Sequence, residues 1–206
     1  MPLIILVAAA LYFVLNRVWP ALIDRTILFF LGSQVILNTF AGYLQYYHIN
    51  NMWLYSVNIL FFLIIFTFYF YRNLFGIRTR KIILACFLLF LIFSCFNVIF
   101  IQPYDTFNSY SYALGALLIV IYSLLGLRQL INFSPEYDIL QLKNFWFAAG
   151  ILLYFGSSFF IFMSYHYLSA VSAKDVGVLW KIHNLFLAVS SIVFLKAIMS
   201  KEWIPK

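Results

Sequence analysis

Charged residues are scarce in this chain of 206 residues, since Asp, Glu, Lys and Arg together make up only 9% of it. A soluble globular domain carries about 25% charged residues. The scarcity therefore excludes an ordinary soluble domain. Cysteine is also rare, and Cys86 and Cys95 lie nine positions apart in one apolar segment. On a helix this spacing is a rise of about 13 Å, too long for a disulfide or a pair of metal ligands.

Sequence patterns of common catalytic sites are also missing. There is no glycine-rich phosphate loop, no paired carboxylate set and no Ser-His-Asp arrangement. A retinal protein needs a lysine near the middle of its last span, but Lys181 and Lys196 lie near the two ends of that run. Seven-helix zinc hydrolases carry a His-x-x-x-His pair there, and Leu187 stands where a partner of His183 would be. We therefore expect no enzyme activity, no catalytic residues, no metal and no other cofactor.

Long apolar runs, by contrast, dominate the chain, which is 66% hydrophobic with a mean hydropathy of +0.99. Crossing the hydrocarbon core of a bilayer takes about 20 residues of helix. Asn16 and Arg17 interrupt the first run, and a cleavable signal peptide is its alternative interpretation, although no basic segment precedes the apolar core. We predict an all-α integral membrane bundle of seven transmembrane helices, forming one domain over residues 1–206. The predicted spans are 2–19, 26–46, 52–71, 82–101, 108–127, 144–166 and 177–199.

The basic residues predict the orientation of these spans. If successive spans alternate in direction, eleven of the 13 Lys and Arg residues fall at one membrane face and only Lys174 and Lys181 at the other. Because basic residues are retained on the cytoplasmic side, we expect the N-terminus outside and the C-terminus in the cytoplasm of a bacterial inner membrane. The formal net charge of +7 suits the lipid bilayer's anionic headgroups or an acidic protein partner, and we expect no nucleic-acid binding. The connections are short, so a signal would leave through a separate protein partner.

Polar side chains inside the predicted spans are few. No Asp or Glu lies near the middle of any span, which argues against a proton-coupled or cation-coupled pump. The plain interpretation of the remaining polar residues is interhelical hydrogen bonding, which contributes about 0.6 to 2 kcal/mol per bond. The alternative is a solute site near the middle of the membrane. The predicted midplane residues are Gln34, Asn38, Asn58 and Asn184.

The predicted outer third of the bundle is richer in polar and aromatic residues, and all three histidines fall there. One interpretation is an outward-facing pocket that binds a small ligand through neutral imidazoles. The other is an aromatic belt at the membrane interface. The predicted pocket residues are His48, Asp105, Asn108, Tyr110, His166, Trp180, Lys181 and His183.

Two parts of the sequence resemble a group of small seven-span membrane proteins of Bacteroidota. They are FNSYSYALGALLIVIYSLL at 107–125, and FWFAAGILLYFGSSFFIFMSYHYL at 145–168 together with LWKIHNLFL at 179–187. The resemblance covers mainly the last four spans and implies the seven-span fold, but no activity. Asn108, Trp180 and His183 match the group's pattern, whereas Phe62 and Gly115 stand where its members often carry Glu.

Three functional hypotheses remain open. The first is a non-catalytic heptahelical sensor or an accessory subunit of a larger membrane assembly. The second is a small transporter of a neutral solute, built from two three-helix halves joined by the fourth span. The third is a membrane lipid hydrolase that would use His48, His166 and His183 with zinc.

Overall fold

The computed structural model describes residues 1–17, 19–74, 76–133, 138–171 and 173–202. The elements are α1 Pro2–Asn16, α2 Leu22–Tyr46, α3 Trp53–Asn73, α4 Ile77–Phe96, the π-helix η1 Asn97–Ile101, α5 Ser109–Phe133, the 3₁₀ helix η2 Ile139–Gln141, α6 Lys143–Val171 and α7 Ala173–Met199. The all-α class is confirmed, because the described residues form helices and no named strand.

Six of these helices, α2 to α7, are long and apolar enough to cross a membrane. The first helix differs from the predicted span 2–19, because α1 contains only 15 residues. At 1.5 Å per residue it is about 22 Å long, against about 30 Å of hydrocarbon. It ends where Arg17 adopts a left-handed conformation with φ 52° and donates its N–H to Phe13 and Val14. A seventh complete span is therefore not confirmed.

The other helices extend beyond the predicted spans. α4 begins at Ile77 rather than at 82 and so includes three basic residues, and α5 continues to Phe133 rather than stopping at 127. An apolar run predicts only the part of a helix inside hydrocarbon, and its polar continuation stays helical where no residue breaks it. The end of α4 is different, because the N–H of Gln102 donates to the carbonyl of Asn97, five residues back, at 2.7 Å. This π-helical turn was not predicted.

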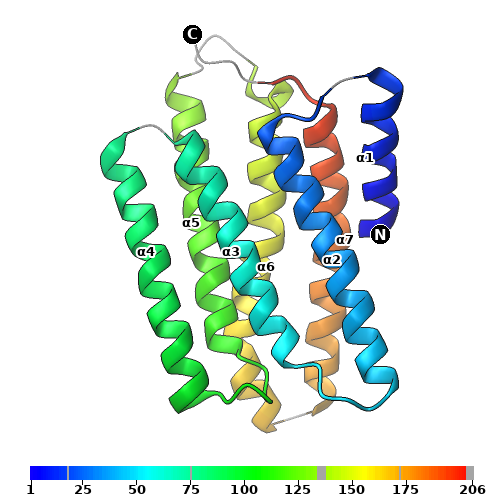
Figure 1. The fold of residues 1–206 in the computed structure, drawn as a ribbon, viewed down its shortest axis with the longest axis vertical. Coiled ribbons are helices and arrows are strands. Elements are labelled where there is room, and N and C mark those ends of the chain that lie inside the picture. The colour runs from blue at the N-terminus through cyan, green and yellow to red at the C-terminus, as the bar shows by residue number, and fades with distance from the viewer. Residues whose placement is uncertain (18, 75, 134–137, 172, 203–206) are drawn as a thin grey trace.

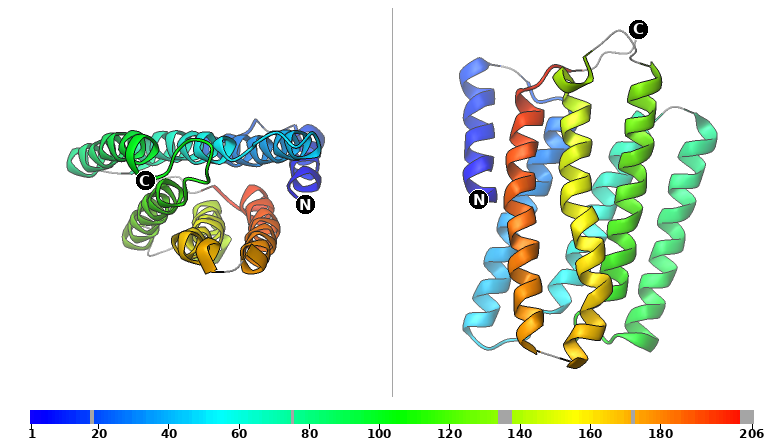
Figure 2. Two further views of the ribbon diagram at one scale, coloured as in Figure 1. Left: turned by 90° about the horizontal axis from the view of Figure 1, so that it is seen from below. Right: turned by 180° about the vertical axis from the view of Figure 1, so that it is seen from behind.

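The helices alternate in direction and are arranged around a closed ring (Figures 1 and 2). Seen along the bundle, α1 to α4 form one layer and α5 to α7 form the other, with α1 packed against both α2 and α7. The alternation places the basic helix ends together at the top of Figure 1, which we call the basic end. α1 begins near mid-height and runs toward the basic end, so it covers only that half of the seam between α2 and α7.

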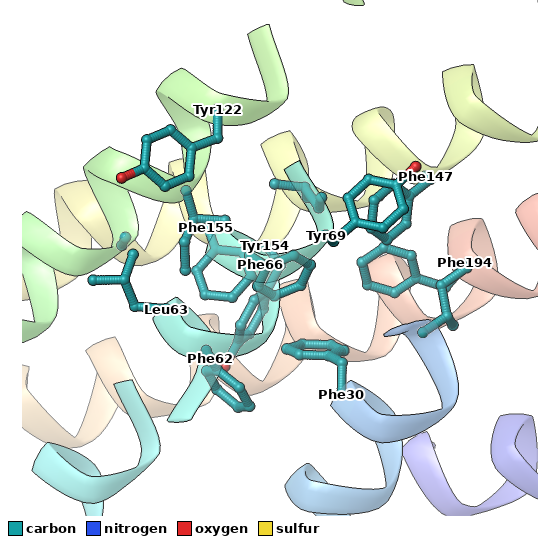
Figure 3. Packing of buried hydrophobic residues seen from close by; sticks show 14 of the residues in the cluster. Phe30, Phe62, Leu63, Phe66, Tyr69, Tyr122, Phe147, Tyr154, Phe155 and Phe194 are labelled. Carbon is teal, nitrogen blue, oxygen red and sulfur yellow. The ribbon is translucent and has the colours of Figure 1, made fainter. Parts of the chain in front are cut away.

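A layer of aromatic side chains fills the centre of the bundle (Figure 3). Phe30 of α2 lies with its ring centroid 5.0 Å from that of Phe62 on α3 and 5.4 Å from that of Phe194 on α7. The ring of Phe194 fits beside Gly150 on α6, where an added Cβ would lie 2.6 Å from it. The aromatic layer consists of Phe30, Phe62, Phe66, Phe147, Phe155 and Phe194, all fully buried or nearly so.

Candidate functional site

A chain of buried polar side chains joins α2, α6 and α7 on the side of the aromatic layer away from the basic end. Gln34 Nε2 donates to Tyr154 Oη at 2.8 Å, and Tyr154 Oη lies 3.3 Å from His183 Nε2. Ser158 Oγ lies 3.3 Å from His183 Nδ1, and Tyr112 Oη of α5 lies 3.5 Å from Tyr154 Oη. These five side chains are all buried, and we call them the central network.

The hydrogen bonds of the central network have one consistent direction. Ser158 Oγ donates its hydrogen to the backbone carbonyl of Tyr154 at 2.7 Å, so it accepts from His183 Nδ1–H. His183 Nε2 then carries no hydrogen and accepts from the Tyr154 hydroxyl, which in turn accepts from Gln34. Because each group of this chain both donates and accepts, the bonds polarise one another.

Aromatic rings enclose the imidazole of His183. The ring of Phe162 lies 4.9 Å from it and that of Trp180 lies 5.9 Å away, measured between centroids. Trp180 also stacks against Tyr55 of α3 at 4.8 Å. The histidine is therefore held in a nearly dry environment, with its two nitrogens on hydroxyl groups of α6.

A cavity of about 450 Å³ lies beside the central network, in the seam between α2 and α7. The side chains that line this cavity are amides, one phenol and small or apolar groups. We call the cavity the polar groove. Asn38 in this groove donates from Nδ2 to Gln34 Oε1 at 3.0 Å, so the groove is connected to the central network by one hydrogen bond. The lining residues are Met1, Pro2, Asn38, Ala41, Gly42, Gln45, Asn51, Tyr55, Asn184, Leu187 and Ala188.

The predicted midplane residues divide between these two features. Gln34 belongs to the central network, while Asn38 and Asn184 line the polar groove and are exposed. Asn58 of α3 lies elsewhere: it is buried, its Oδ1 has no hydrogen-bond partner, and it lines neither feature.

The predicted outer-pocket residues are distributed over several places. Trp180 and His183 are in contact, and the rings of Tyr110 and His166 lie 5.3 Å apart. The remaining residues do not join these pairs. His48 is exposed after α2 with φ 57°, Lys181 is exposed on α7, and the Asp105 carbonyl accepts from Asn50 at 2.6 Å. Within the described residues, no three His, Cys, Asp or Glu side chains lie close enough to hold a metal ion.

Asn108 belongs to a separate amide cluster at the junction of η1 and α5. Asn97 Nδ2 lies 3.0 Å from Asn108 Oδ1, 3.0 Å from Ser111 Oγ and 3.2 Å from Gln102 Oε1. Gln102 also donates to Ser109 Oγ at 3.0 Å. The cluster closes the π-helical turn and holds the start of α5, and of its members only Asn108 was predicted as a site residue.

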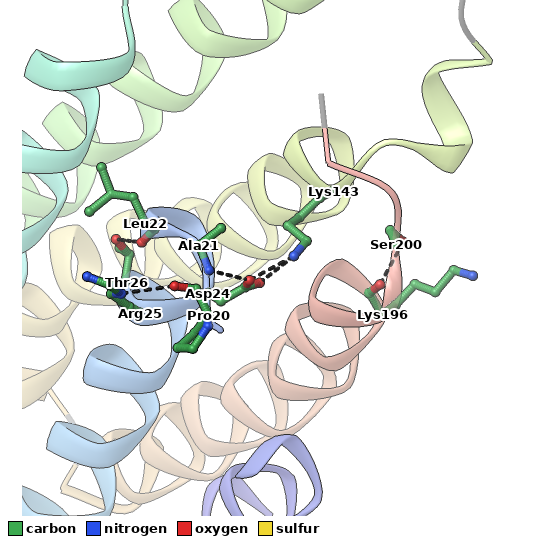
Figure 4. Close-up of polar contacts among 9 residues, drawn as sticks. All are labelled: Pro20, Ala21, Leu22, Asp24, Arg25, Thr26, Lys143, Lys196 and Ser200. Atoms are coloured by element: carbon green, nitrogen blue, oxygen red, sulfur yellow. Dashed lines mark hydrogen bonds and ion pairs between the residues drawn. The ribbon is translucent and has the colours of Figure 1, made fainter. Parts of the chain in front are cut away.

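A buried ion pair at the basic end was missed entirely (Figure 4). Lys143 Nζ at the start of α6 lies 2.7 and 2.8 Å from the two carboxylate oxygens of Asp24 in α2. Asp24 Oδ2 also accepts a hydrogen bond from the backbone N–H of Ala21 at 3.0 Å. A carboxylate in the first helical turn that accepts from the N–H three residues before it is typical of helix capping. The capping pattern was a usable signal for Asp24, but no local pattern links it to a lysine 119 residues away.

The basic end also contains a second, smaller cavity, of about 180 Å³, between α2, α3, α5 and α6. Its lining combines aromatic side chains, among them Tyr69, Phe70 and Phe147, with polar side chains such as Arg72 and Asn144. Phe147 of the aromatic layer therefore faces this cavity, while the polar groove lies on the other side of that layer.

Comparison of the chain with protein-family models, with curated proteins and with solved structures gave no match. Function must therefore be inferred from the geometry of the molecule itself.

Proposed function

We propose that the chain is a non-catalytic integral membrane sensor, in which a ligand in the polar groove alters the central network. One observation carries this proposal. Asn38 is exposed in the groove and makes the first hydrogen bond of a directed chain that runs through Gln34 and Tyr154 to His183. In this proposal α1 is the seventh helix of a bundle in a bacterial inner membrane, its first residue points toward the outer face, and the basic end faces the cytoplasm.

The contacts of α2 provide a route for the signal. α2 and α6 both run away from the basic end, and they are joined at two levels, Gln34 with Tyr154 and Asp24 with Lys143. A ligand that competes for Asn38 weakens the hydrogen bond from Asn38 to Gln34. The buried amide oxygen of Gln34 then loses this partner, and a buried polar group left unpaired costs about 1 to 3 kcal/mol. A shift of α2 against α6 would then strain the ion pair at the basic end. A protein partner docked at that basic, cytoplasmic face would receive the change.

The surroundings of the histidines favour a role without catalysis. Within the described residues, the ring nitrogens of His183 lie on the hydroxyl groups of Tyr154 and Ser158, while His166 lies against Tyr110 and His48 is exposed. A zinc hydrolase needs three converging ligands and a position open to water. The separate placement of these residues therefore supports the sensor over the lipid hydrolase.

One further observation favours a transporter as the second candidate. The polar groove and the basic-end cavity lie on opposite sides of the aromatic layer, as an occluded pathway with a hydrophobic gate would require. A transporter moves a neutral solute across the membrane of liposomes that contain this protein and no other, whereas a sensor does not. Flux of uncharged solutes into such liposomes separates the two functions.

Occupancy of the groove can be tested with a matched pair of glycine variants. An added Cβ at either Gly42 or Gly32 of α2 meets no atom within 4 Å, but only Gly42 lines the groove. We expect mass spectrometry of protein in native nanodiscs to find a small molecule with the wild type and Gly32→Leu, and to find at least tenfold less with Gly42→Leu. Equal retention by all three proteins would contradict the proposal.

The sensor role has its own measurement, made on Trp180 after the other four tryptophans are replaced by phenylalanine. Trp180 stacks on Tyr55 of the groove and on His183 of the network, so ligand binding should shift its emission. The shift should disappear in Gln34→Leu, which breaks the connection while leaving the groove lining intact. An unchanged response in Gln34→Leu would show that the network carries no signal.

A further inference from the structure

The chemistry and depth of the polar groove identify the class of its ligand. We infer that the groove binds the neutral, hydrogen-bonding headgroup of a long-chain amphiphile that enters sideways from the bilayer. The inference rests on the proposed function for its site, and it adds the identity of the ligand class.

The lining of the groove favours an uncharged headgroup. Its polar side chains are the amides of Asn38, Gln45, Asn51 and Asn184 and the phenol of Tyr55, and none of the described side chains that line it is charged. Each amide offers both donors and an acceptor. A charged headgroup would lose its hydration here without a charged side chain to pair with, which costs several kcal/mol. The α-amino group of Met1, one of the lining residues, would in addition repel a cation.

Part of this hydrogen-bonding capacity is unused. The Asn51 amide donates to the Ala41 carbonyl at 3.0 Å, and the Asn38 amide donates to Gln34. Within the described residues, the side-chain amides of Gln45 and Asn184 make no hydrogen bond, although both line the groove. A headgroup with hydroxyl or amide functions would supply both of them with partners.

The depth of Asn38 and Asn184 indicates that lipid, rather than water, surrounds these two amides. Asn38 lies 16 residues after the start of α2, about 24 Å along a helix of about 37 Å. Asn184 lies 11 residues after the start of α7, about 16 Å from the end opposite the basic end. Both side chains are exposed on the bundle and line the polar groove. Asn184, whose amide makes no hydrogen bond within the described residues, lies at this depth, and an unpaired amide in hydrocarbon costs free energy that a lipid-borne headgroup would recover.

The surface beside the groove suits a long alkyl chain. Ala41, Gly42 and Ala188 are small and leave space for the headgroup, since a Cβ added at Gly42 meets nothing within 4 Å. Leu185, the residue after Asn184 on α7, is a large exposed apolar side chain. The tail can therefore stay among the bilayer lipids while its head enters the groove.

The test uses three probes with the same oleyl chain: 1-oleoylglycerol is neutral, oleyl sulfate is anionic and oleyl trimethylammonium is cationic. Each is added at the same mole fraction to the full chain in phosphatidylcholine nanodiscs, and native mass spectrometry measures the bound fraction. We expect at least tenfold more bound 1-oleoylglycerol than either charged probe. Asn184→Leu and Gly42→Leu should each lower that binding at least tenfold, while Gly32→Leu should bind as the wild type does.

Equal or greater binding of a charged probe would overturn the inferred ligand class, and so would unchanged binding of 1-oleoylglycerol by Gly42→Leu. The Trp180 emission separates this failure from failure of the sensor. Specific binding of 1-oleoylglycerol without an emission shift supports the ligand class and refutes the sensor. An emission shift produced only by a charged probe supports the sensor and refutes the ligand class.

Discussion

The buried ion pair between Lys143 and Asp24 predicts a large and asymmetric effect of substitution. The side chains are 8% and 2% exposed, so water scarcely screens their attraction. At 2.7 Å, Coulomb's law with an effective dielectric constant of about 20 gives an attraction of about 6 kcal/mol, which offsets the cost of burying both charges. Lys143→Met removes the attraction and leaves the Asp24 carboxylate buried with only the N–H of Ala21. We expect it to lower the free energy of unfolding by about 3 to 5 kcal/mol.

The double variant distinguishes an ion-pair effect from a general packing defect. Asp24→Asn combined with Lys143→Met leaves no buried charge, and the Asn side chain can still accept from Ala21. It should therefore recover most of the loss, with a coupling energy of at least about 2 kcal/mol. Unfolding in mixed micelles with increasing dodecyl sulfate, followed by circular dichroism, measures Lys143→Met, the single variant Asp24→Asn and the double variant. Lys181→Met is the control, because this exposed lysine should change stability by less than about 0.5 kcal/mol. A Lys143→Met cost below about 1 kcal/mol, or purely additive single effects, would refute the reasoning.

Three other predictions concern packing, the amide cluster and orientation. Gly150→Ala places a methyl group against the ring of Phe194 and should lower the free energy of unfolding by about 1 to 3 kcal/mol in the same assay. The control Gly156→Ala adds a methyl group that meets no atom within 4 Å and should not destabilise the protein. Equal effects of the two variants would contradict the close packing at Gly150. Asn108→Leu removes an acceptor of the Asn97 amide and should cost about 1 to 3 kcal/mol, and a neutral effect would show that the cluster does not hold α5. In a cysteine-free background, Ser200→Cys at the basic end should resist a membrane-impermeant maleimide in intact bacteria and react after lysis, and labelling in intact cells would reverse the proposed orientation.

The composition and the long apolar runs were sufficient to predict the helices and their alternating directions. A bilayer requires about 20 apolar residues per crossing, and each connection reverses the chain, so the number and direction of helices follow from the sequence with little dependence on packing. The gathering of basic residues at one end follows from the same alternation. The first helix is the exception, because its apolar run continues past Asn16 while the helix itself ends there.

Side-chain contacts between helices depended on the tertiary structure. Phe29 and Phe30 are adjacent and chemically identical, yet Phe29 is 64% exposed and Phe30 is 0% exposed. In a soluble helix the polar face would reveal the difference, but here the outer face meets lipid that is as apolar as the core. Hydrophobic periodicity therefore says little about which face of a membrane helix turns inward.

The candidate site shows the same division. Gln34 and Asn38 lie one turn apart on one helix, so their hydrogen bond could be anticipated from their spacing. Their connection to Tyr154 and His183, like the pairing of Asp24 with Lys143, depends on which faces of α2, α6 and α7 pack against one another. The sequence by itself determined which segments form helices long and apolar enough to cross a membrane, and at which end of the bundle the basic residues gather. The packing of the ring decided which of them meet, because partners on different helices share no local pattern in the chain.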